Sequence, residues 1–235
     1  MLNCLTSFLM LCLFPLVIST AHSEATSSDS SFSFVDIANS YTSPAEQNST
    51  FKYFVSDILS SANLPAFVCD TGSLTWDGSA EEYESLKSNI QPLSDERIRF
   101  CPVPGTRDMR WCGEAKKRYQ KNFGPLYYSV NYKGFHLIFL DSTEVLERQG
   151  HFDDPEIVWL QRDLTKLKPT TPVFIFLHHI IGYGNEFTRE IDNEFDFRSL
   201  LPKHNILAIF TSTCLCGCFK FDKEILTSCG DTFTE

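Results

Sequence analysis

Short apolar runs recur along the chain at lengths that suit buried strands. Runs of this kind, bounded by Gly, Pro or polar residues, predict strands that are covered on both faces. They lie at residues 32–37, 66–69, 98–103, 173–177 and 206–210. Two further segments, 126–132 and 135–140, flank Lys133-Gly134, and this dipeptide predicts a hairpin between them.

Helical patterns separate these strands. In residues 47–62 the apolar side chains recur every three or four positions, which predicts an amphipathic helix. Ser79 suits the N-cap of a helix over 80–89, and a further helix is expected over 114–123. Pro155 suits the first turn of a helix over 155–167. Because strands alternate with helices, the chain is expected to form a layered α/β domain.

The beginning of the chain has the pattern of a secretory leader. No Lys, Arg, Asp or Glu precedes Glu24, and residues 5–18 are almost entirely apolar. A run of that length matches a signal-peptide core and falls short of the roughly 20 residues of a membrane span. Small residues around Ala21 suit cleavage. The alternative is an uncleaved anchor, since the uncharged stretch reaches Ser23.

We therefore expect a signal peptide over 1–23, a flexible Ser/Thr-rich lead-in over 24–31 and one domain over 32–235. The protein is then secreted or resident in the secretory lumen, and no membrane span is expected after the signal. Asn48 begins an Asn-Ser-Thr sequon, so it is a candidate glycosylation site in that compartment.

The number of cysteines indicates whether a disulfide to another chain is expected. Of nine cysteines, Cys4 and Cys12 fall in the expected signal peptide. The seven that follow are Cys69, Cys101, Cys112, Cys214, Cys216, Cys218 and Cys229. An odd number leaves at least one thiol free or paired with another chain, so a disulfide-linked partner is one expectation.

Composition and charge indicate a globular protein and argue against one class of function, the binding of nucleic acid. Hydrophobic residues make up 43% of the 235 residues and charged residues 21%, as in an ordinary globular protein. The formal net charge is −10, and a protein that coats nucleic acid would instead carry excess basic residues. A nucleic-acid partner is therefore not expected.

Polar segments follow the predicted strands, and their flanks resemble the calcineurin-like metallophosphoesterases. Residues 72–78 (GSLTWDG) resemble the family's G-D-L-T-x-D-G, and residues 103–108 (VPGTRD) resemble its V-P-G-N-H-D. The resemblance runs from about Phe32 to Phe221. It implies a four-layer α/β/β/α sandwich of two mixed sheets flanked by helices. It also implies a hydrolase of phosphate esters that works through two divalent cations.

Some positions of the family's motifs are kept. By this resemblance, Asp36 matches the Asp of D-x-H, and His178 matches the strand-end His, with His179 as the alternative. These three residues are the candidate metal ligands. Arg107 stands at the position of the family's proton donor, and Asp108 at that of the acid that orients it, so both are candidate catalytic residues.

More of the ligand positions are lost. The replacing residues lack the donor atom or the charge of the ligand, and they are Ala38, Ser73, Thr106, Thr213 and Leu215. Disturbing even an outer partner of a metal ligand typically costs 10- to 100-fold in affinity or activity, so losing several ligands should cost far more. We therefore expect that the two-metal centre does not assemble and that no cofactor is bound. We also expect Arg107 to pair with Asp36, or with Asp108, in place of the metal charge, unless it points to water.

Three functions follow from these residues. The first is a secreted pseudophosphoesterase with impaired catalysis. The second is an active phosphoesterase whose rearranged centre holds Fe, Mn or Zn on Asp36, Asp108 and His178 or His179. The third is an interaction module that is linked to its partner through cysteine. The segment after the last motif is short for the family, so the domain is expected to be truncated at its C-terminus.

Overall fold

The computed structural model describes residues 31–43, 49–182, 190–212, 220–222 and 225–229. The expected signal peptide, nearly all of the lead-in, Asn48, Thr213 and Leu215 lie outside these residues. So do Cys214, Cys216 and Cys218 of the cysteine-rich segment. Among the described residues, no helix is both long enough and apolar enough to cross a membrane.

Two sheets form the centre of the domain. The smaller sheet has the order β1-β2-β3 and is parallel throughout. Its strands are β1 (Val35–Ile37), β2 (Phe67–Asp70) and β3 (Arg99–Pro102). The larger sheet has the order β4-β5-β6-β7-β9-β8. Its strands are β4 (Tyr128–Tyr132), β5 (Phe135–Phe139), β6 (Pro172–Phe176), β7 (Asn205–Thr211), β8 (Lys220–Asp222) and β9 (Ile225–Cys229). Antiparallel strands lie at both of its edges, so the larger sheet is mixed.

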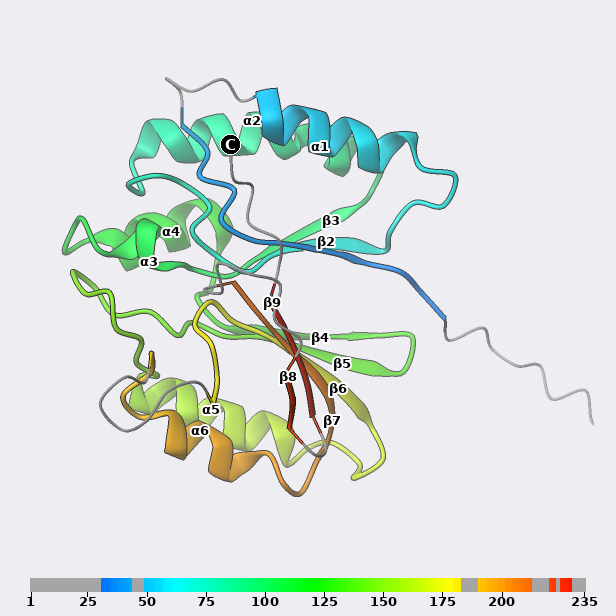
Figure 1. Cartoon of the computed structure of the whole chain (residues 1–235), viewed down its shortest axis with the longest axis vertical. Helices are drawn as coiled ribbons and strands as arrows, with labels where there is room; N and C mark the ends of the chain where they lie inside the picture. Colours follow the sequence, from blue (N-terminus) through cyan, green and yellow to red (C-terminus); the bar gives the residue numbers. More distant parts are fainter. Residues whose placement is uncertain (1–30, 44–48, 183–189, 213–219, 223–224, 230–235) are drawn as a thin grey trace, which may run out of the picture. The chain divides into compact units, whose positions relative to one another are not determined.

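Helices cover the outer face of each sheet (Figure 1). The helices are α1 (Ser49–Ser60), α2 (Ala80–Asp95), α3 (Thr106–Met109), α4 (Ala115–Phe123), α5 (Asp154–Leu164) and α6 (Glu194–Leu200). One core joins α1, α2 and α4 to the smaller sheet, and a second joins α5 and α6 to the larger sheet. This arrangement confirms the α/β/β/α sandwich.

A third core fills the space between the sheets, and it is built from phenylalanine. The ring centroids of Phe34 and Phe67 are 4.9 Å apart in a stacked pair. Phe176 stacks on both Phe139 and Phe210, with 4.8 Å between centroids in each pair. This packing accounts for much of the unusual Phe content, 21 residues, because aromatic side chains bury large areas in one layer.

The predicted elements differ from the observed ones mainly in their ends. Ser79 is the N-cap of α2 as expected, and its side chain accepts a hydrogen bond from Glu82 N at 3.4 Å. That helix continues to Asp95, beyond the predicted end at 89, with Pro92 inside it. Sequence periodicity gave no sign of α3 and α6, which are short.

The fold brings several chain turns to one edge of the two sheets. The segments that follow β1, β2 and β3 lie together there, because parallel strands place their carboxyl ends on one side. The segments after β6 and β7 join them, since His178 Nδ1 lies 3.0 Å and Ser212 Oγ 2.8 Å from the carbonyl oxygen of Thr71, which follows β2. Every described residue that resembles a site position of the family lies in these segments or at the end of β1.

Candidate functional site

Two glycines allow the segments after β2 and β3 to touch through their backbones. A Cβ atom on Gly105 would lie 1.8 Å from Ser73 N, so only glycine fits there. Gly72 has a φ of +104°, and a Cβ on it would lie 2.8 Å from His178 Nδ1. Ser73 itself has a φ of +58°, an uncommon conformation for a residue with a side chain. The sequence therefore forces Ser73 against α3.

Asp108 holds this contact together. Its Oδ1 accepts hydrogen bonds from Thr75 N at 3.0 Å and Thr75 Oγ1 at 2.7 Å. Its Oδ2 accepts from Leu74 N at 3.1 Å and Gly105 N at 2.9 Å. Burial outweighs these bonds and raises the pKa of Asp108 to about 6. Both oxygens face the backbone, so Asp108 acts here as a clamp between two loops.

His178 is buried in a set of hydroxyl and carbonyl groups. Its Nδ1 lies 3.0 Å from the carbonyl of Thr71, which can only accept, so Nδ1 carries the proton. Ser212 Oγ contacts the same nitrogen and donates to Thr71 O at 2.8 Å. Nε2 is then an acceptor and lies 3.5 Å from Ser73 Oγ. Burial, with the neighbouring His179, lowers the pKa of His178 well below its usual range. The ring is therefore neutral.

His179 has the opposite tautomer. Its Nε2 lies 3.2 Å from both Arg148 O and Thr106 Oγ1, and the carbonyl requires a proton on that nitrogen. Its Nδ1 then accepts from Ser142 Oγ at 2.9 Å. The rings of His178 and His179 are perpendicular, with 4.9 Å between centroids. Burial lowers the pKa of His179 as well.

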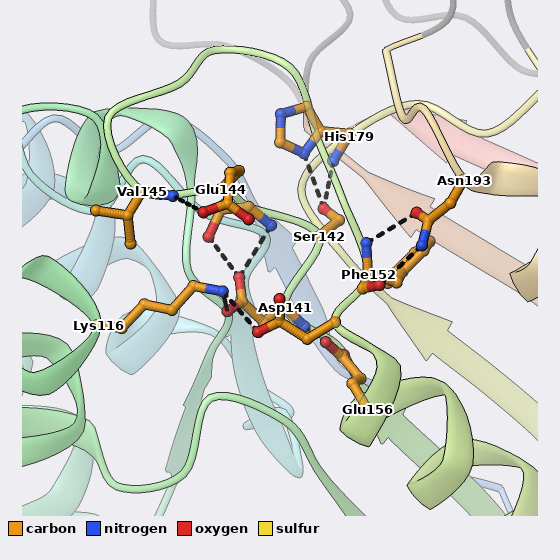
Figure 2. A network of polar contacts seen from close by, with 11 residues as sticks. Lys116, Asp141, Ser142, Glu144, Val145, Phe152, Glu156, His179 and Asn193 are labelled. Carbon is orange, nitrogen blue, oxygen red and sulfur yellow. Dashed lines mark hydrogen bonds and ion pairs between the residues drawn. The ribbon is translucent and has the colours of Figure 1, made fainter. Parts of the chain in front are cut away.

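A network of charged groups places Ser142 beside His179 (Figure 2). Lys116 Nζ lies 3.2 Å from Asp141 Oδ2 and 3.1 Å from Asp153 Oδ2. Partial burial opposes the charge, but these two carboxylates raise the pKa of Lys116. Asp141 N donates to Glu156 Oε1 at 2.8 Å. Lys116 of α4 and Glu156 of α5 hold Asp141 in place, so Ser142, which follows it in the chain, is held in place as well.

Asp36 packs against the neighbouring strand of the smaller sheet. It sits in β1 beside Cys69 of β2, and among the described residues its buried Oδ1 has no hydrogen-bond partner. Burial, and then the neighbouring Asp70, raise its pKa well above the usual range. Among the described contacts, none joins Asp36 to His178 or His179. The candidate ligands therefore do not form one cluster.

The guanidinium of Arg107 lies against aromatic rings. Its guanidinium carbon lies 4.0 Å from the centroid of Trp76 and 5.6 Å from that of Tyr41. Among the described residues, no ion pair joins Arg107 to Asp36 or Asp108. The expected pair is therefore wrong, and so is a side chain that points only to water. A cation–π stack on an exposed indole replaces them.

Sequence reasoning did not assign a role to several residues that contact the site. Asp70 is fully buried, accepts from Ser40 Oγ at 2.6 Å and has its pKa raised to about 8, chiefly by burial. Ser142 contacts His179 and Ser212 contacts His178, and the guanidinium of Arg107 stacks on the ring of Trp76. Each follows a predicted strand within a few residues, and that position was the available signal.

The described residues do not fit a pair of divalent cations. Ser73 and Thr106 bring neutral hydroxyl groups to the two imidazoles, at positions where the sequence resemblance implies a bridging carboxylate and an amide. Asp108 is used by four donors, and Asp36 faces Cys69. Within the described part of the chain, no three His, Cys, Asp or Glu side chains lie together in a way that could hold a metal ion.

The arrangement of sheets and helices is that of the metallophosphoesterase fold. Purple acid phosphatase PPD1 from yellow lupin superposes with a TM-score of 0.63 at 13% identity, over 85% of this chain and 44% of that one. GAP50, described as the anchor in the inner membrane complex of Plasmodium, gives 0.54 at 15% identity, over 84% and 70%. Phosphopantetheinyl hydrolase of Mycobacterium tuberculosis gives 0.51 at 10% identity, over 85% and 89%.

Sequence comparison points the same way. A probable glycerophosphodiester phosphodiesterase, GpdQ of Arcobacter nitrofigilis, is 28% identical over 121 residues, which cover 49% of this chain and 42% of that protein. The chain thus spans less than half the length of this relative and of the lupin phosphatase. No family model matches the sequence.

Proposed function

We propose that this chain is a metallophosphoesterase-fold protein whose phosphoesterase activity is impaired and which acts by binding. The observation that carries the proposal is the substitution of ligands by hydroxyl groups. Ser73 and Thr106 each meet a histidine nitrogen that a ligand set would turn toward a cation. Neutral hydroxyls do not balance the charge of two divalent cations, so the chemistry that such a pair supplies has no support here.

A binding role agrees with the way the site is preserved. The loops are still held by the Asp108 clamp, and the two histidines are still buried at the sheet edge. These contacts support a site whose loops stay ordered without a cation between them. GAP50, which has a similar fold, is described as an anchor, so an anchoring role occurs on a fold of this class.

Metal content and hydrolysis test this proposal together. The mature protein is purified without chelator, and its Zn, Mn and Fe are measured by elemental analysis. Hydrolysis of a generic phosphodiester and a generic phosphomonoester is then assayed with each metal added. We expect substoichiometric metal and no turnover above the buffer blank. Two equivalents of metal with turnover would overturn the proposal in favour of the rearranged active centre.

Secretion is part of the same proposal. The leader pattern over 1–23 and the sequon at Asn48 are its support. Expression of the full chain in a eukaryotic secretory host should give a protein in the medium that begins near Glu24. Asn48→Gln should remove any mass shift caused by a glycosidase. Retention of the leader on a membrane-bound product would instead indicate an anchor.

A cysteine-linked partner is a separate candidate. Cys69, Cys101 and Cys112 are free thiols in the described structure, and the first two are buried. A linkage to another chain would then involve Cys112 or the cysteines of the C-terminal segment. Intact mass of the secreted protein with and without reductant tests this, because a linked partner adds its mass only in the oxidised sample.

A further inference from the structure

Three arginines gather beside the hydroxyl and imidazole cluster. The backbone of Arg107 is tied to the cluster, since its N–H donates to Ser73 Oγ at 3.4 Å. The backbone of Arg148 is tied to it from another loop, through the bond from His179 Nε2. Arg110 ends α3, and the charges of Arg107 and Arg148 both act on it. Arg107 and Arg110 therefore come from α3 and its C-terminal end, and Arg148 from the loop that contacts this helix, where Leu146 N donates to Met109 O at 3.4 Å.

Exposed aromatic rings support two of these arginines. Arg107 lies on Trp76, and the guanidinium carbon of Arg110 lies 4.1 Å from the centroid of Trp111. The two indoles are 49% and 52% exposed. A guanidinium that stacks face-on against a ring keeps its N–H donors in the plane, directed outward. Stacking thus orders the two side chains without using their hydrogen bonds.

Charge at this place is unbalanced. Within the described part of the chain, no ion pair of Arg107, Arg110 or Arg148 with a carboxylate is found, although the whole protein carries a net charge of −10. Asp108 is close by, but its oxygens serve backbone donors. Burial, and then Arg107 and Arg148, lower the pKa of Arg110. Like charges held together in this way favour a bound anion.

The stack also decides which nitrogens of Arg110 a ligand can reach. Its Nε has no hydrogen-bond partner among the described residues and is shielded from solvent. The side chain as a whole is only partly buried, so the outer nitrogens of the guanidinium are the donors that a ligand would meet.

We propose that Arg107, Arg110 and Arg148 form a metal-independent site for the dianionic phosphate group of a small ligand. The inference rests on the proposed binding function and names its ligand class. Planar guanidinium groups match phosphate oxygens in pairs of hydrogen bonds, and three of them supply charge at a place where the described residues hold no cation pair. The ligand is inorganic phosphate or a phosphate monoester, and the exposed indoles favour an ester with a flat ring.

The test measures binding by calorimetry in a chelating buffer at low salt. The probes are inorganic phosphate, ribose 5-phosphate and adenosine monophosphate, which separate the phosphate group from the sugar and the base. The first two probes can also be followed by tryptophan fluorescence, because two of the three tryptophans, Trp76 and Trp111, lie at the site. Trp159 packs against the core beneath the larger sheet and serves as the internal reference.

Single substitutions assign the site. Arg107→Gln, Arg110→Gln and Arg148→Gln should each weaken binding by about 10- to 100-fold, since each removes a charge-assisted contact. Arg162→Gln on the exposed face of α5 is the matched control, because it changes the net charge equally. Thermal melts of all four variants establish that they fold.

Each outcome decides the inference. Binding of at least one probe in chelator, weakened by the three variants and unchanged in the control, supports it. Absence of binding, binding only after metal is added, or equal effects of Arg162→Gln would overturn it. A parallel assay with manganese separates the two proposals. Turnover there overturns the impaired function and leaves the arginine site standing, whereas no binding and no turnover overturns only the arginine site.

Discussion

The guanidinium carbon of Arg107 lies 4.0 Å from the centre of the Trp76 ring, and in the described structure no ion pair joins it to Asp36 or Asp108. Arg107, which the sequence resemblance aligns with a proton donor, thus forms no ion pair with these carboxylates and does not turn freely in water. It is held at the rim of the site by an indole that is itself half exposed.

The energy of this contact distinguishes a stack from a buried pair. Arg107→Ala should destabilise the fold by about 0.5–1 kcal/mol, which is the range for a cation–π contact at an exposed site. A double-mutant cycle with Trp76→Ala, followed by urea unfolding, should return a coupling of similar size. A loss of about 3–5 kcal/mol on Arg107→Ala would contradict the stack, because that is the cost of breaking a buried ion pair.

The close approach of the loops gives a second prediction. Gly105→Ala should destabilise the fold severely, by at least about 3 kcal/mol, because the new Cβ would lie 1.8 Å from Ser73 N and must push two backbones apart. Gly113→Ala is the matched control, since a Cβ there meets nothing within 4 Å. That variant should stay within about 0.5 kcal/mol of the parent protein.

Thermal melts of the two glycine variants provide the measurement. Equal melting temperatures would show that the loops do not touch as described. The same experiment bears on the site, because Gly105 positions Ser73 and α3 together. A folded Gly105→Ala protein should also lose the phosphate binding proposed for Arg107 and Arg110, which lie at and just after that helix.

Repair of a single site residue gives a third prediction. Arg107→His would restore the residue type that the family uses as proton donor, but it adds no ligand for a cation. Groups that act as one catalytic unit are strongly non-additive, so one repair should leave hydrolysis at the background. Hydrolysis of a generic phosphodiester with Mn, Zn or Fe added is the measurement. Robust turnover by Arg107→His alone would mean that a working metal centre is already present.

The sequence predicted the layers of the fold because they depend on periodic apolar residues. Strands such as β6 are continuous apolar runs, and α5 carries Pro155 in its first turn, so both were expected within a few residues. The short helix α3 has only four residues and begins after Gly105. It depends on the Asp108 clamp, which is a contact between loops and leaves no local pattern.

The candidate site was predictable in its location but less so in its contacts. The resemblance placed Ser73, His178 and His179 at one sheet edge, and the structure has them there. It could not foresee that Ser212 would meet His178, because that contact joins the loops after β6 and β7 and leaves no pattern in either segment. Nor could it foresee the stack of Arg107 on Trp76, since the geometry of a side chain at a rim depends on three loops at once.

Asp70 provides a fourth prediction, which concerns pH. Burial raises its pKa from an ordinary value of 3.8 to about 8, and hydrogen bonds from Ser40 and Gly72 N only partly oppose this. Between about pH 4 and pH 8 the unfolded chain therefore releases this proton while the folded chain keeps it. The folded state binds more protons there, so stability falls as pH rises through this window, by up to ~1.4 kcal/mol per pH unit from this group. Below pH 4 Asp70 is protonated in both the folded and the unfolded state, so it does not lower the free energy of unfolding.

Asp70→Asn replaces the titratable carboxyl group by an amide of the same shape that does not titrate. The amide can still accept from Gly72 N and bond Ser40 Oγ. The free energy of unfolding of this variant should match the parent near pH 4 and exceed it increasingly up to about pH 8, with a constant difference above. Urea unfolding at a series of pH values measures this, with Asp57→Asn on the exposed face of α1 as the control. A difference that does not change with pH would mean that Asp70 ionises normally in the folded protein.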